Sequence, residues 1–136
     1  MGTRSATEAI LAHWQAGWPH TPTATGNATF DPAPGQPWVR LSVMDGASRQ
    51  VSVGTPTGGG ILDRSDGVIA IQIFTPDDQG EAQGRWLADA ACILLRRKSL
   101  AGGITTLVPS VTVVGNEGAW HQINVSCPFW RDELVA

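Results

Sequence analysis

The chain has 136 residues, a formal net charge of −3 at pH 7 and a charged fraction of 15%. This length suits a single domain over residues 1–136, which can bury enough apolar surface to fold without a disulfide or a metal. The composition excludes the broad basic face of a nucleic-acid-binding protein, and no stretch approaches the roughly 20 apolar residues of a membrane span.

The first predicted element is a helix in the segment SATEAILAHWQAGW, residues 5–18. Ser5 and Glu8 have the spacing of a capping box, and Ile10 and Trp14 recur at helical spacing. The segment that follows, up to residue 37, is rich in proline and cannot form a regular helix.

Alternating apolar residues predict a hairpin over residues 38–53. The segments WVRLSV and RQVSVG each place valines on one face, and Asp45-Gly46 between them is typical of a turn. Residues 54–67 then include three consecutive glycines, which are entropically costly to order, so we predict a flexible loop there. Loops of this length within a domain are usually functional or disordered.

In the second half of the chain, the sequence pattern predicts a strand, a long helix and two further strands. VIAIQIFTP, residues 68–76, is apolar on both faces, which predicts a central strand covered on both sides. Residues 77–98 have helical periodicity, with Asp77 or Asp78 as the cap, and would span about 25–30 Å. The segments 104–115 and 119–129 follow as strands joined by a turn at GNEG.

The order of these elements predicts an α+β fold with a mostly antiparallel sheet. An N-terminal helix and one long central helix flank this sheet. The helices do not alternate with the strands, so a doubly wound parallel sheet is excluded.

No combination of residues in the sequence points to catalysis or metal binding. The histidines are scattered, and His121 and Cys127 lie about 20 Å apart along one strand, too far to form a dyad. Cys92 and Cys127 lie outside any zinc-site spacing and are predicted to be buried thiols, with a disulfide between them as the alternative. The glycine run has no lysine and does not match a phosphate-binding loop. We therefore expect no enzymatic activity, no cofactor and no metal.

Six segments, taken in order, resemble the phage tail terminator-like family, whose members are encoded among the tail genes of long, flexible-tailed phages. The similarity extends from about Glu8 to Asp132. The segments are QAGWPHTP, NATFDP, WVRLSV, GVIAIQIFTP, WLADAA and VPSVTVVGNEGAWHQINVSCPFWRD.

The resemblance implies a structural virion protein similar to the lambda-type tail terminator. Such a protein forms a hexameric ring at the head-proximal end of the tail, ends polymerisation of the tail tube and provides the surface to which the head attaches. The implied partners are further copies of the chain, the tail tube protein and the head–tail connector protein. DNA passes through such a ring without specific recognition, no membrane is involved, and assembly takes place in the host cytoplasm.

A ring requires two different patches on each subunit, and the low charged fraction favours such association. Arginine and tryptophan are enriched in the energetic centres of interfaces, and a glycine-rich loop that orders on docking would delay assembly until the tube is met. The candidate interface residues are Arg40, Arg49, Gly58, Gly59, Gly60, Arg64, Asp66, Trp120, Trp130 and Arg131.

Two alternative functions remain open from the sequence. One is another ring protein of the head–tail connector or a tail completion protein, because these also combine a small α+β fold with ring symmetry. The other is a small ligand-binding or hydrolytic α+β domain, which would need a pocket with convergent polar groups.

Overall fold

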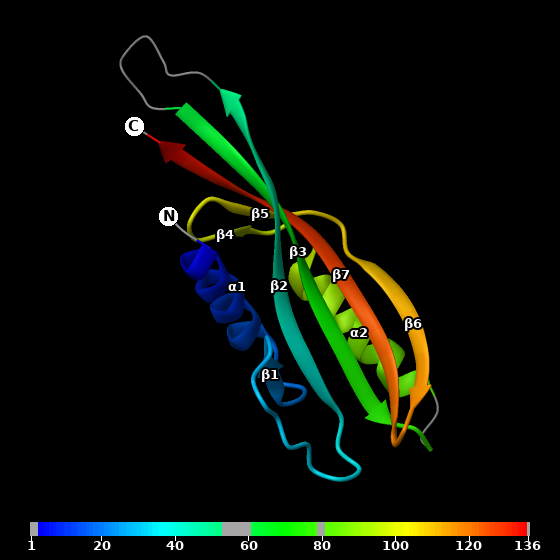
Figure 1. Ribbon diagram of the computed structural model, residues 1–136. Coiled ribbons are helices and arrows are strands. Elements are labelled where there is room, and N and C mark those ends of the chain that lie inside the picture. The colour runs from blue at the N-terminus through cyan, green and yellow to red at the C-terminus, as the bar shows by residue number, and fades with distance from the viewer. Residues whose placement is uncertain (1–2, 53–60, 79–80, 136) are drawn as a thin grey trace.

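A computed structural model describes residues 3–52, 61–78 and 81–135 (Figure 1). In this part of the chain two helices pack against a seven-stranded sheet. Neither helix is long and apolar enough to span a bilayer. The elements are α1 (Thr3–Gly17), β1 (Thr23–Thr25), β2 (Trp38–Ser52), β3 (Ile61–Pro76), α2 (Ala82–Leu95), β4 (Ser99–Leu100), β5 (Ile104–Thr106), β6 (Ser110–Glu117) and β7 (Trp120–Val135).

The last strand lies in the middle of the sheet. The strand order is β1-β2-β3-β7-β5-β4, and β6 also pairs with β7. β6 and β5 share one side of β7, with β6 beside residues 120–126 and β5 beside residues 129–131. Every pairing is antiparallel except the short one between β1 and β2. The structure thus confirms an α+β fold with a mostly antiparallel sheet.

The hydrophobic core lies between one face of the sheet and the two helices. We call this the inner face of the sheet and the opposite one the outer face. The sheet contributes the alternate apolar residues of β3 and β7 to this core. The helices contribute the apolar residues that recur about every 3.6 positions, as the sequence predicts. Fully buried members of the core are Ile10, Trp14, Val39, Ile69, Ile71, Ile73, Ala91, Leu95, Ile123, Val125 and Cys127.

The outer face of the sheet does not have the cover that the sequence predicts. On β3, Val68, Ala70 and Phe74 point to this face and are only partly buried, and neither helix of the described residues lies over them. The prediction of a strand covered on both faces is therefore wrong for this part of the chain. The apolar residues at alternate positions of β3 instead give the outer face of the sheet a partly exposed apolar surface.

The predicted turn at Asp45-Gly46 is also wrong. β2 continues through these residues to Ser52 and pairs with β3 on both sides of them, with a register shift between Asp45 and Ser48. Such a β-bulge inserts a residue and increases the local twist without reversing the chain. Gly46 is needed here because a Cβ atom would lie 2.7 Å from the backbone oxygen of Asp66.

The predicted flexible loop over residues 54–67 extends too far along the chain. Residues 61–67 belong to β3, where β2 pairs on one side and β7 on the other. Two ladders of backbone hydrogen bonds stabilise this segment despite its glycine, serine and aspartate content. Residues 54–60, including Gly58, Gly59 and Gly60, lie outside the described residues.

Both helices begin or end at residues other than those predicted. α1 already includes Thr3 and Arg4, so Ser5 is not its N-cap. α2 has 14 residues, begins after Glu81 and spans about 21 Å, so it is shorter than the predicted long central helix. At its C-terminus the backbone leaves the helical conformation, with Arg96 extended and Arg97 at a φ of 50°, and the buried Thr106 hydroxyl donates to the Leu95 oxygen at 2.5 Å.

Three strands extend beyond the helices and form an arm. We define the arm as residues 45–52 of β2, 61–66 of β3 and 131–135 of β7, which lie together above the N-terminal end of α1 in Figure 1. The sheet below the arm carries the hydrophobic core.

Candidate assembly surfaces

The candidate residues are distributed along one face of the sheet. Side chains at even positions of β3 and β7 point to the outer face, and the strand register aligns their β2 neighbours with them. All the described candidates lie on this outer face except Arg131, which points to the inner face. The structure brings together residues that are distant in sequence, such as Arg64 and Trp130, and places Arg40 and Trp120 toward the other end of the same face.

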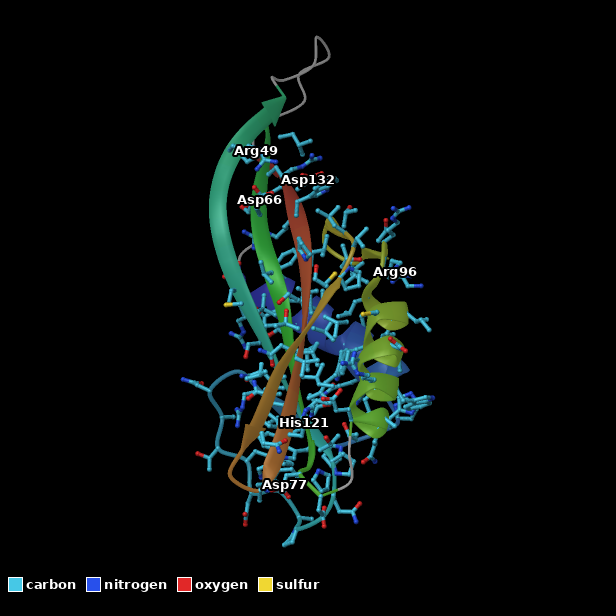
Figure 2. All side chains as sticks on the ribbon, turned by 90° about the vertical axis from the view of Figure 1, so that its right-hand side faces the viewer. Arg49, Asp66, Asp77, Arg96, His121 and Asp132 are labelled. Carbon is cyan, nitrogen blue, oxygen red and sulfur yellow. The ribbon has the colours of Figure 1, made fainter. Side chains whose placement is uncertain are left out.

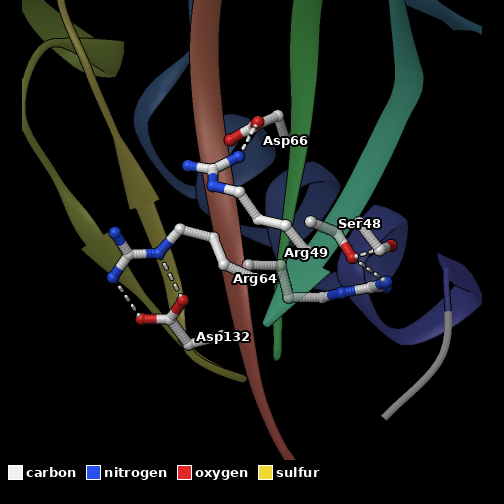
Figure 3. A network of polar contacts seen from close by, with 7 residues as sticks. Ser48, Arg49, Arg64, Asp66 and Asp132 are labelled. Atoms are coloured by element: carbon white, nitrogen blue, oxygen red, sulfur yellow. Dashed lines mark hydrogen bonds and ion pairs between the residues drawn. The ribbon is translucent and has the colours of Figure 1, made fainter. Parts of the chain in front are cut away.

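Arg64 on the arm is held by two residues of β7. Its guanidinium donates two hydrogen bonds to the Asp132 carboxylate, at 2.7 and 3.0 Å (Figure 3). It also lies over the Trp130 ring, 4.1 Å from the ring centroid. The hydrogen bond to Asp132 raises the pKa of Arg64. This bidentate, stacked geometry favours arginine over lysine, because only the planar guanidinium satisfies both neighbours.

Arg49 and Asp66 form a second cross-strand ion pair on the arm, between β2 and β3 (Figures 2 and 3). Beside them, on the inner face, the Ser48 and Ser65 hydroxyls are 2.7 Å apart. These pairs connect the three strands by side chains as well as by backbone hydrogen bonds. The charges of Arg49, Arg64 and Asp66 are thus compensated within the subunit.

Arg131 lies at the base of the arm and differs from the other candidates. Its side chain is only 7% exposed, and its Nη2 atom lies 3.5 Å from the Ser65 hydroxyl. Its Nε and Nη1 atoms have no hydrogen-bond partner among the described residues. Its burial places it beneath the sheet rather than on the surface where Trp130 lies.

An aromatic cluster occupies the outer face at the other end of the sheet. Trp38 stacks between Phe30 and Phe74, with ring centroids 4.9 and 4.3 Å away, and Trp120 meets it edge-on at 6.2 Å. Arg40 lies 5.6 Å from the Trp38 ring and donates to the backbone oxygens of residues 26 and 28. These contacts hold the proline-rich segment against β2.

An open pocket of about 420 Å³ lies beside this cluster. Trp38, Phe74 and Trp120 form its apolar lining, and Gln72 and Gln122 supply side-chain amides. The Nε1 atom of Trp38 is buried without a hydrogen-bond partner in the described part of the chain. The pocket has the composition of an interface centre, in which aromatic groups are surrounded by neutral polar ones.

The sequence analysis missed one exposed apolar surface, at the edge of the sheet where β6 faces α2. Here Ile93 is 70% exposed, and Val111 and Val113 are 42% and 39% exposed. The segment SVTV alternates polar and apolar residues as a strand with one solvated face does, so no local pattern revealed that its valines lie at an exposed edge.

His13, Cys92 and Cys127 have structural roles. His13 lies with its Nε2 atom 2.8 Å from the Leu94 oxygen, which connects the two helices. Cys92 and Cys127 are free and buried, and burial raises the pKa of Cys127 to about 11. A thiol with such a pKa is not a nucleophile at neutral pH. The described residues contain no cluster of three or more potential metal ligands.

Comparison with known proteins identifies the family. A solved structure with 18% sequence identity matches the protein with a TM-score of 0.65, over 99% of both chains, which supports the fold. No curated protein matches the sequence. A family model described as phage tail terminator protein matches residues 3–129. Because this match covers nearly the whole chain, the protein belongs to the phage tail terminator family and is a structural component of the phage tail.

Proposed function

We propose that the protein forms a ring that caps the phage tail tube, ends tube polymerisation and provides the surface for head attachment. Membership of the terminator family supports a role in the tail. The observation that carries the ring is the presence of two dissimilar surfaces on one subunit, the aromatic outer face and the apolar edge at β6. Dissimilar surfaces favour head-to-tail association, which closes into a ring when the rotation between subunits allows it.

The ring would contain six copies and would meet two other proteins. The tail tube protein would contact one face of the ring, and the head–tail connector protein would contact the other. Assembly takes place in the host cytoplasm, and the finished ring lies at the head-proximal end of a long, flexible tail. The net charge of −3 suits a lumen through which DNA passes without specific binding. The role is structural and requires no cofactor.

The test is to remove the gene from a phage that encodes the protein and to measure tails by electron microscopy. Without a terminator, we expect tubes longer than in the parent phage and heads without tails, because nothing stops tube growth. Expression of the protein from a plasmid should restore tail length and head joining. Tails of normal length that fail to join heads would instead identify a joining or completion protein. Normal infectious particles would overturn the proposal.

A further inference from the structure

β6 is an edge strand without the usual protection against pairing. Among the described residues it pairs only with β7, so its other side presents free backbone donors and acceptors. Natural edge strands are commonly protected by charged residues or proline. Residues 110–114, with the sequence SVTVV, contain neither, and the register shift of this strand begins only after Val113.

A groove next to β6 increases the apolar surface at this edge. The groove has a volume of about 400 Å³, and its apolar lining includes Ile93 of α2 and Val111 of β6. Asp89 of α2 and Arg96, directly after this helix, also line the groove, and Figure 2 shows Arg96 at the end of the helix. Val113 points to the same face of the sheet as Val111, because both lie opposite core residues of β7. A strand added to β6 would therefore also cover exposed apolar side chains.

The opposite edge of the sheet offers the matching surface. β1 pairs only with residues 39–41 of β2. From Ser42 onward, the edge of β2 that points away from β3 therefore has no neighbouring strand in the described chain. In this part of β2, Val43 points to the inner face and is partly buried, and Met44 points to the outer face and is 51% exposed. The edges at β2 and β6 thus both carry apolar residues on the inner face.

The direction of the strands also suits this pairing. β2, β3, β7 and β6 run alternately up and down, so β2 and β6 of one subunit have opposite directions. A second copy, rotated about an axis roughly parallel to the strands, would present β2 antiparallel to β6 of the first. The new pair would continue the antiparallel order of the sheet across the subunit boundary.

We propose that β6 of one copy pairs with β2 of a second copy, next to residues 42–46, so that the sheet continues head to tail from subunit to subunit. This inference rests on the proposed function, because a head-to-tail contact repeated by rotation builds a ring. The partner is another copy of the chain, since both halves of the contact, including their strand direction and apolar residues, are present on one subunit.

The test joins the two edges by a cross-linker in a double variant, Met44→Cys with Thr112→Cys. Thr112 points to the outer face, like Met44, because it lies opposite Asn124. A bismaleimide with a reach of about 8 Å spans both direct and diagonal cross-strand neighbours, so a register shift of two residues is tolerated. The wild-type protein is the background control, because its two cysteines are buried. The reaction is run on concentrated protein and on tails assembled with the variant as the only copy.

We expect covalent species larger than dimers from the double variant, and no more than background from either single variant. Efficient dimers from Thr112→Cys alone would show that β6 pairs with β6 across a two-fold axis, and would overturn the proposal. Absence of cross-linked species in tails that are still capped would also overturn it, while leaving the proposed function intact. Cross-linked species together with normal tails in the gene deletion would instead refute the proposed function alone.

A charged substitution provides a second readout on the same edge. In Val113→Lys, the ammonium group would have to enter the new contact, so we expect association to weaken at least about tenfold, the range of interface hot spots. Trp86→Lys is the matched control, because Trp86 is 57% exposed but lies outside the groove. Circular dichroism checks that both variants remain folded. Equal association of the two variants would contradict the role of β6.

Discussion

Cys127 shows how burial at one residue determines a property of the whole protein. Its thiol is fully buried and lies within 3.6–3.8 Å of the backbone oxygens of Leu95, Leu107 and Pro128. Burial raises the pKa to about 11, since a thiolate would lose its hydration there. In the unfolded chain the same thiol has its ordinary pKa of 9.0.

Stability should therefore decrease as the pH rises from about 9 to about 11. In this range the unfolded chain loses the Cys127 proton while the folded protein keeps it, so unfolding becomes more favourable by about 2–3 kcal/mol in total. The raised pKa of Cys92 acts in the same direction. Denaturant titrations of the wild type and of Cys127→Ala measure this effect. The chain has no tyrosine and a single lysine, so few other groups titrate in the window.

Cys127→Ala loses packing contacts equally at every pH, so only the difference in pH dependence between the variant and the wild type reports on ionisation of the thiol. We expect a less steep pH dependence for Cys127→Ala, together with a lower stability at neutral pH. An equally steep decrease in the variant would contradict the assignment to Cys127.

At the scale of the element, β3 depends on a glycine at the base of the arm. Gly67 lies directly opposite Phe129 of β7, and a Cβ atom there would lie 2.5 Å from the phenylalanine ring and 2.8 Å from the Met44 oxygen. The ring covers the position where a side chain would stand. Such aromatic cover of a glycine compensates for the missing side chain in a strand.

Gly67→Ala should reduce the free energy of unfolding by about 1–3 kcal/mol, the usual cost of overpacking a tight site. Chemical denaturation measures the change. Ser126→Ala is the control, because Ser126 is exposed on the neighbouring strand and surface changes usually stay within about 0.5 kcal/mol. If the two variants had equal stability, the close contact with Phe129 would not constrain β3.

The sequence predicted those elements whose periodicity reflects burial. α1, the part of β3 after Gly67, and β7 up to Phe129 were predicted as a helix and strands, because apolar side chains repeat there with a clear period, although the predicted cover on the outer face of β3 was wrong. The arm was missed, since residues 61–67 are stabilised by pairing with β2 and β7, which local composition does not encode. The end of α2 was missed for the same reason, because the hydrogen-bond partner of its Leu95 oxygen, Thr106, lies 11 residues further along the chain.

The candidate surface was predicted as a set of residues and not as a geometry. Arginine and tryptophan indicated interface chemistry, but the ion pairs of Arg64 with Asp132 and of Arg49 with Asp66 depend on strand register. The apolar edge at β6 became visible only when its position in the sheet was known. The glycines at positions 58–60 remain a prediction.

At the scale of the whole molecule, the surfaces described above predict how association depends on salt. Four charges of the arm, on Arg49, Asp66, Arg64 and Asp132, are paired within the subunit, whereas the edge at β6 and the outer-face cluster are apolar or aromatic. Burial of apolar surface is not screened by salt, unlike attraction between exposed charges.

We therefore expect a hexamer-sized particle in multi-angle light scattering whose fraction does not fall between about 0.1 and 1 M salt, where the Debye length shrinks from about 10 to 3 Å. Trp120→Ala should lower that fraction, with Trp86→Ala as the exposed control on α2. Dissociation of the particle by salt would show that charge pairs between subunits dominate. A monomer under all conditions would require the tail tube as template, which a capping assay with purified tube protein would measure.

The central position of β7 has a consequence for synthesis of the chain. Among the described strands β7 is the last to be synthesised, yet β3, β5 and β6 all pair with it, and β3 pairs along its whole length. The sheet is therefore incomplete until residues 120–135 have emerged, and most of its stabilising contacts form between segments distant in sequence. A nascent or prematurely terminated chain lacks β7, the strand that connects the β2–β3 pair to β6 and so places the edges at β2 and β6 in one sheet. Only finished subunits would then enter the assembly, so unfinished ones could not block a growing tail.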